Sequence, residues 1–177
     1  MIATTPRGTL NYITNCYIHI TGLQEANTNI VMNILPDISD SKSASYSDEP
    51  AIGRSFPIKS YSHSENRTIS WTAHFMITEE NDPQRLLAIL RLIEAATYPQ
   101  DGSPYSPPPI CKLRCGSLLG ENELCAVLKS YSVKFPTDVA WDEATYLPYK
   151  FDVDMSFDVV YDSDSLPGAE RIVNFGG

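Results

Sequence analysis

The sequence is poor in basic residues. Its 177 residues include 13 Lys and Arg against 22 Asp and Glu, which gives a formal net charge of −9 at pH 7. Proteins that wrap nucleic acid need cationic side chains to neutralise phosphates. The composition therefore argues against a nucleic-acid-wrapping protein, although it allows a surface along which nucleic acid passes without sticking.

Long apolar runs are also missing. The longest ones fall far below the roughly 18 to 20 residues that a membrane span needs. The start of the chain, MIATTPRGTLNYITN, has no basic stretch followed by an apolar run. We therefore expect no membrane association and no secretory signal, so that synthesis takes place in a cytoplasm.

The short motifs of common catalytic sites do not occur. The sequence has no phosphate loop, dinucleotide fingerprint, Gly-x-Ser-x-Gly elbow or His-Glu-x-x-His pair. Its three histidines, His19, His63 and His74, are scattered without neighbours that would complete a triad. We expect a protein that is not an enzyme and that uses no cofactor and no metal.

The four cysteines do not form a metal-binding pattern, because no second Cys or His pair follows CKLRC at ligand spacing. In an extended strand Cys111 and Cys115 would lie about 13 Å apart, which is too far for a mutual disulfide. We interpret the cysteines as small buried side chains. The alternatives are a disulfide between Cys115 and Cys125 or a bridge between subunits.

Alternation of apolar and polar residues dominates the chain and is typical of β-strands. Strands are expected over 11–20, 28–36, 67–78, 110–115, 125–135 and 150–161. In the strand at 125–135, one face is expected to carry Cys125, Val127, Tyr131, Val133 and Phe135.

One helix is expected over about 82–98, with Asp82 as N-cap, Pro83 in the first turn and Pro99 after the last. We predict a mainly β (α+β) fold, an antiparallel β-sandwich or barrel packed on this helix. A single domain would cover 1–161 and a C-terminal tail 162–177. The Ser-rich, weakly patterned segment 37–62 is expected to be a long loop or an arm.

The last strand contains a row of acidic residues. Asp152, Asp154 and Asp158 alternate with apolar residues, so they form the polar face of a strand. Their spacing does not follow the Ca²⁺ loop. Two carboxylates on alternate residues could serve a glycosidase, but nothing else in the chain suggests a sugar cleft. A solvated face, or a face that must repel polyanions, are the other interpretations.

Several short motifs occur in a fixed order along residues 11–161. They are Pro36, the Ser-rich 39–47, Gly53-Arg54-Ser55-Phe56-Pro57, Tyr61, Arg67-Thr68-Ile69-Ser70, Tyr98-Pro99, Trp141 and Leu147-Pro148. This order resembles the tail-tube-like domain of baseplate proteins, the tube initiators or adaptors, of contractile-tailed phages and related contractile injection systems.

The resemblance implies a structural virion protein. Its subunits would form a homohexameric ring whose strands join into one β-barrel, as a layer of the tail tube or of the baseplate hub. Its partners would be copies of itself, neighbouring tail tube and baseplate hub proteins, and DNA that passes without specific binding during ejection. The protein would be made in the host cytoplasm and end in the phage tail.

Together with the net charge, the resemblance suggests that Asp152, Asp154 and Asp158 face an acidic lumen. Between a plain tube protein and a baseplate adaptor we favour the adaptor. The main alternative is a monomeric β-sandwich module that binds a carbohydrate or protein ligand, because ten Tyr and two Trp could supply stacking surfaces. An enzyme that uses the carboxylate pair is a third.

Overall fold

The computed structural model describes residues 15–23, 28–32, 34–50, 52–53, 55–77, 82–99, 106–119 and 123–160, so the expected tail at 162–177 lies outside it. The elements in this part of the chain are β1 (Cys16–Ile20), β2 (Asn29–Val31), β3 (Asp37–Ser41), β4 (Ala44–Glu49), β5 (Ile58–Ser64), β6 (Thr68–Met76), α1 (Asp82–Ala95), β7 (Ile110–Cys115), β8 (Leu124–Lys134) and β9 (Lys150–Val159).

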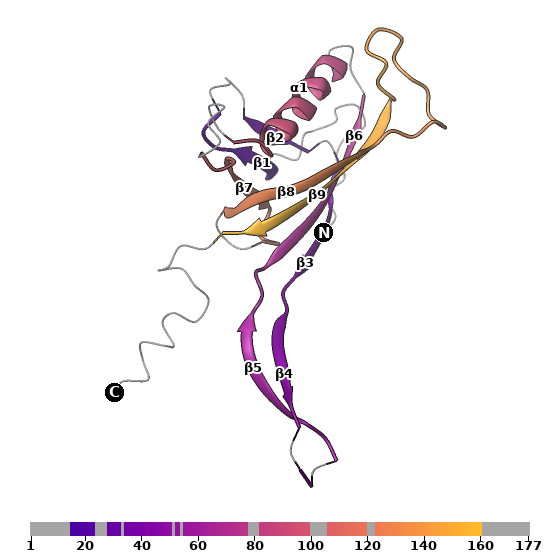
Figure 1. Ribbon diagram of the computed structural model, residues 1–177. Helices are drawn as coiled ribbons and strands as arrows, with labels where there is room; N and C mark the ends of the chain where they lie inside the picture. The colour runs from indigo at the N-terminus through magenta and orange to yellow at the C-terminus, as the bar shows by residue number, and fades with distance from the viewer. Residues whose placement is uncertain are drawn as a thin grey trace, which may run out of the picture.

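Seven of the strands form one antiparallel sheet in the order β2-β1-β7-β8-β9-β6-β3. Helix α1 lies over one face of this sheet (Figure 1). The mainly β fold with a single packed helix is therefore confirmed. Among the described residues the sheet is open and does not close into a barrel, because β2 and β3 lie at its two ends.

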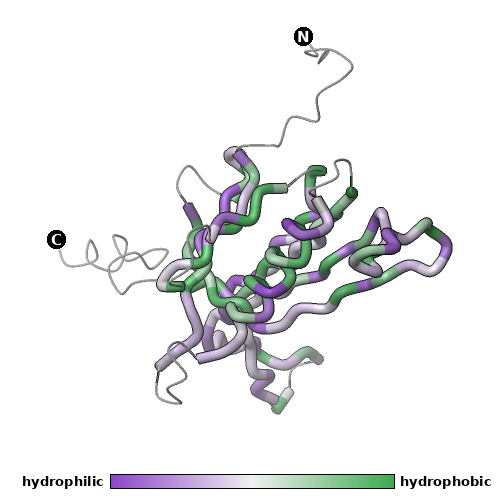
Figure 2. Tube along the Cα trace, turned by 90° about the horizontal axis from the view of Figure 1, so that it is seen from above, coloured by the Kyte–Doolittle hydropathy of each residue, from purple (hydrophilic) through white to green (hydrophobic). Residues whose placement is uncertain are grey.

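The core lies between α1 and the sheet. Strands β6 and β9 pair along nine residues, and every second residue of each points toward the helix. Hydrophobic and hydrophilic residues alternate along the strands beside α1 (Figure 2). The largest buried side chains of these two strands are Ile69, Trp71, Phe75, Phe151 and Phe157. The alternation in the sequence thus places the apolar groups of β6 and β9 on one face, except for Met76 at the end of β6, which is exposed.

Helix α1 ends three residues before the predicted boundary near Tyr98. Ala96 still donates to the carbonyl of Leu92, but Thr97 and Tyr98 donate to carbonyls only three residues back. The last turn therefore tightens before Pro99, which cannot continue a helix.

The face prediction for β8 was wrong in part. The register of β8 against β9 shifts between Leu128 and Ser130. This β-bulge reverses the alternation, so Tyr131 faces the core with Leu128, whereas Cys125 and Val127 lie on the opposite face.

The segment expected to be a loop or an arm contains three strands. β3 joins the main sheet through β6, and β4 pairs with β5 in a separate two-stranded sheet. This β4–β5 hairpin, which we call the arm, projects away from the body (Figure 1). Nearly all of its described residues are exposed, and none of these belongs to the hydrophobic core.

Candidate functional site

The face of the sheet opposite α1 carries hydroxyl and charged side chains along its central strands. We call this the polar face. Its polar residues on β6, β9 and β8 include Thr68, Ser70, Thr72, His74, Lys150, Asp152, Asp154, Ser156, Asp158, Lys129, Ser130, Ser132 and Lys134. The structure thus brings the three predicted aspartates together on one face of β9.

On one side, each aspartate is held by a side chain of β6. Thr68 Oγ1 donates to Asp158 Oδ1 at 3.2 Å, and Thr72 Oγ1 donates to Asp154 Oδ1 at 2.7 Å. His74 Nδ1 lies 2.6 Å from Asp152 Oδ1. Each pair sits directly opposite in the β6–β9 register, so the contacts follow from strand pairing.

On the other side, lysines of β8 neutralise two of the carboxylates. Lys134 Nζ lies 2.5 Å from Asp154 Oδ2, and Lys129 Nζ lies 3.4 Å from Asp158 Oδ2. The ion pair with Lys134 and the hydrogen bond from Thr72 hold the pKa of Asp154 below its usual range. The aspartate row is therefore largely charge-balanced rather than a bare acidic stripe.

The lysines of β8 and the roles of Thr68, Thr72 and His74 were missed by sequence analysis. Lys129 and Lys134 are an odd number of residues apart, so strict alternation would put them on opposite faces. The bulge between Leu128 and Ser130 adds one residue to β8, so both lysines lie on the same face, beside β9.

His74 lies between two carboxylates. Its Nε2 is 3.2 Å from Asp37 Oδ2 on the edge strand β3, and its Nδ1 contacts Asp152. The hydrogen bond to Asp152 raises the pKa of His74, partial burial opposes this, and the bond to Asp37 adds to the rise. The imidazolium form therefore joins β3, β6 and β9 across the polar face.

We expect stability to fall as pH rises through the folded-state pKa of His74. Because that pKa lies above the ordinary value of 6.5, the contribution is fully present below 6.5 and is lost on the alkaline side. The free energy of unfolding, measured with urea, should be lower at pH 9 than at pH 6 in the wild type. This decrease should be about 1 kcal/mol larger in the wild type than in His74→Gln. A His74→Gln variant that keeps the wild-type difference would contradict the assignment.

A second polar cluster lies on the same face at β1 and β7. Tyr17 Oη donates to Glu123 Oε1 at 2.6 Å, and Lys112 Nζ lies 3.3 Å from Glu123 Oε2. The hydrogen bond to Glu123 raises the pKa of Tyr17, and the same bond lowers the pKa of Glu123. Here too the cation is paired with a carboxylate.

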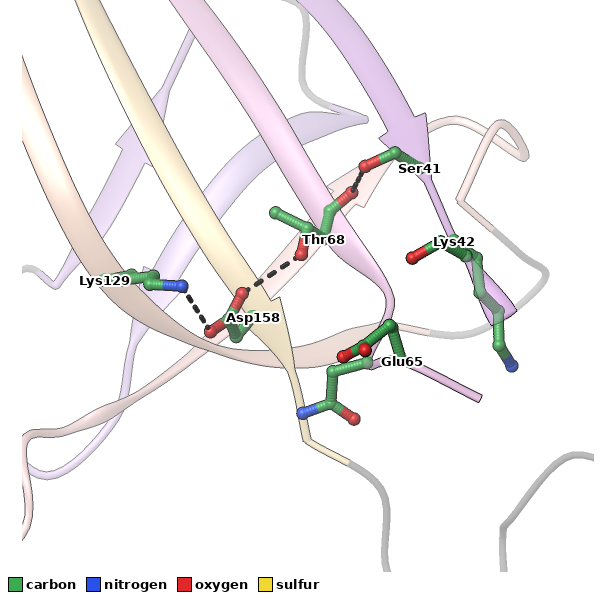
Figure 3. A pocket seen from close by; sticks show the side chains of 8 residues that line it. Ser41, Lys42, Glu65, Thr68, Lys129 and Asp158 are labelled. Carbon is green, nitrogen blue, oxygen red and sulfur yellow. Dashed lines mark hydrogen bonds and ion pairs between the residues drawn. The ribbon is translucent and has the colours of Figure 1, made fainter. Parts of the chain in front are cut away.

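A polar pocket of about 490 Å³ lies where the arm leaves the body. Its walls include Ser41, Lys42, Glu65, Thr68, Lys129 and Asp158, which come from the base of the arm and from the polar face (Figure 3). The pocket thus continues the polar face onto the arm.

The sequence left a Cys115–Cys125 disulfide open as an alternative to small buried cysteines, and Cys16, Cys111 and Cys115 are indeed buried. Cys115 lies beside Cys16, with the two Sγ atoms 3.0 Å apart, on the core face. Cys125 pairs with Lys112 on the polar face, so the structure does not bring Cys115 and Cys125 together.

Among the described residues, no group of three or more His, Cys, Asp and Glu side chains has a geometry suited to a metal ion. In the same part of the chain, no helix is both long and apolar enough to span a membrane.

No family model and no curated protein matches the chain. One solved structure similar to it is described as the tail of an empty GTA particle with C6 symmetry. The chain of that structure is 9% identical, with a TM-score of 0.40 over 86% of this chain and 96% of that one. A likeness this weak shows neither a family nor a function for this chain.

Proposed function

We propose that the protein is a structural component of a phage-like tail, a ring-forming subunit whose polar face lines a channel for DNA. The observation that carries the proposal is that the two faces of the main sheet differ, one apolar and the other polar. One face is buried under α1, and the other presents a row of cross-strand pairs between carboxylates, lysines and hydroxyls. The motif order over residues 11–161 supplies the tail context.

The open edges of the sheet support ring formation. In the described part of the chain, β2 and β3 are the end strands of the main sheet, and an end strand can pair along its outer edge with a strand of another chain. Pairing of β2 of one subunit with β3 of the next would be head to tail, which generates a ring when the rotation closes. Six subunits would then form one continuous barrel without edges.

The pairing of charges suits a channel for a polyanion. Free lysines would bind phosphates and slow the passage of DNA, because each contact releases counterions. Asp154 and Asp158 engage Lys134 and Lys129, so these cations are neutralised where DNA would pass. We propose that the aspartates act in the lumen by keeping the lining from becoming basic.

The arm is proposed to contact a neighbouring subunit or ring. It exposes several apolar side chains, which gain no burial in the monomer. Exposed apolar side chains that gather in one place mark interaction surfaces. Ile52 and Phe56 near its tip are 108% and 81% exposed. Tyr46 and Tyr61 pack edge to face at 5.7 Å between ring centroids and stiffen the hairpin.

Of the tail layers, we favour a baseplate adaptor, or tube initiator, over a plain tube subunit. The partners would be further copies in a homohexamer, together with tail tube and baseplate hub proteins. The subunit would be made in the host cytoplasm and would act in the virion, and the proposal includes no catalytic step.

The mass of the purified protein in solution, with negative-stain images, tests this proposal. We expect rings or short tubes of six-fold appearance. A protein that stays monomeric at high concentration and binds a glycan on an array would contradict it.

A binding module is the second candidate, because aromatic side chains are exposed in the link between β8 and β9. Trp141, Tyr146 and Tyr149 are all exposed there, and Trp141 bridges to Pro148. Against a β-sandwich, α1 covers the face that a second sheet would occupy. Loss of glycan binding in Trp141→Ala would favour this candidate.

A further inference from the structure

The core contains a pair of thiols that face each other across two strands. Cys16 of β1 and Cys115 of β7 are direct partners in the antiparallel register, although 99 positions separate them in the sequence. Their Sγ atoms lie 3.0 Å apart, and the side chains are 1% and 4% exposed.

The position in the ladder favours a covalent link. The backbone N–H of Gly116 donates to the carbonyl of Asn15 at 2.8 Å, which makes Asn15 and Gly116 a hydrogen-bonded pair. The adjacent pair, Cys16 and Cys115, is therefore a non-hydrogen-bonded one, in which Cα atoms approach to about 4.5 Å. That separation lies within the range that a disulfide spans.

We propose that Cys16 and Cys115 form a disulfide when the protein meets a small oxidant such as a peroxide. One thiolate attacks the peroxide O–O bond, which gives a sulfenic acid and hydroxide. The second thiolate then attacks the sulfenic sulfur and displaces its oxygen as hydroxide, which protonates to water. Two thiols and one hydrogen peroxide thus become one disulfide and two waters.

The other two cysteines lack such a partner. Cys111 pairs with Ile20 and Ala126 in the sheet, and burial raises its pKa to about 11. Cys125 is half-buried on the polar face. Burial also raises the pKa of Cys16, so thiolate is scarce in the closed core and the bridge forms slowly unless the strand ends open.

The disulfide would fix the pairing of β1 with β7 and close a loop that holds β2 to β6, the arm and the helix. A link over so long a loop stabilises chiefly by restricting the unfolded chain. This inference does not depend on the proposed function.

The test is peptide mapping of wild-type protein after hydrogen peroxide treatment in sub-denaturing urea. We expect a non-reduced digest to contain a Cys16–Cys115 cross-linked peptide, with a mass roughly 2 Da below the sum of the two free peptides because two hydrogens leave. The thermal midpoint of the oxidised protein should exceed that of the reduced protein by roughly 5–10 °C.

Cys125→Ser is the matched control and should keep both the link and the shift, whereas Cys16→Ala should lose both. Oxidation of Cys125 in the wild type shows that the oxidant is active. Its oxidation without a Cys16–Cys115 peptide, or a Cys16–Cys115 link found only in covalent dimers, would overturn the proposal.

Discussion

Replacing the arm, residues 44–64, with an Asn-Gly turn is expected to abolish assembly while the body stays folded. The base of the arm is closed by a hydrogen bond from Glu65 N to Ser43 O at 2.9 Å. A two-residue turn between these residues therefore matches the existing hairpin geometry. None of the arm side chains that the structure describes belongs to the core, so little stability should be lost.

The expected result is a monomer in sedimentation, with a thermal midpoint within a few degrees of wild type. The loss should exceed a factor of about 100 in the association constant, because exposed aromatic and aliphatic anchors dominate interface energies. Lys59→Ala, which removes only an exposed ion pair with Asp48, is the control and should assemble normally. Rings that form without the arm would show that the arm is not part of the contact.

The triple change Asp152→Asn, Asp154→Asn and Asp158→Asn is expected to make the protein bind DNA. It leaves Lys129 and Lys134 without their counter-charges on the polar face. Two freed lysines should raise affinity for duplex DNA roughly 10- to 100-fold at low salt and steepen the log-log salt slope by about 2. Asparagine keeps the size of each side chain and its ability to accept from Thr68 or Thr72.

Fluorescence anisotropy with a labelled duplex across a salt series measures this effect. Adding Lys129→Gln and Lys134→Gln to the triple variant is the control and should return binding to the wild-type level. A folded triple variant with unchanged affinity and salt slope would show that the aspartates do not mask these lysines.

In particles, reversing the three charges to lysine should slow genome ejection.

Strand β9 illustrates what sequence alone can predict. Its alternation is unbroken because one face packs on the core and the other does not. Burial of one face therefore requires an apolar residue at every second position of the strand. The aspartates could be assigned to one face for that reason. The arm has no such signal, since both faces of β4 and β5 are exposed, and its strands therefore looked like a loop.

The pairing of strands that are distant in the sequence could not be predicted from the sequence alone. The bulge in β8 has no marker in the sequence, so neither the reversal at Cys125 nor the placement of Lys129 beside Asp158 could be deduced. The Cys16–Cys115 contact depends on the register of two strands 99 positions apart. Local periodicity does not encode which strands become neighbours.

A cryo-electron microscopy reconstruction of the assembled particle tests the central claim most directly. We predict a six-fold ring in which β6, β8 and β9 turn the polar face, with Asp154 on it, toward the channel and α1 lies outside. A ring in which α1 lines the channel, or in which the polar face is buried between subunits, would contradict it.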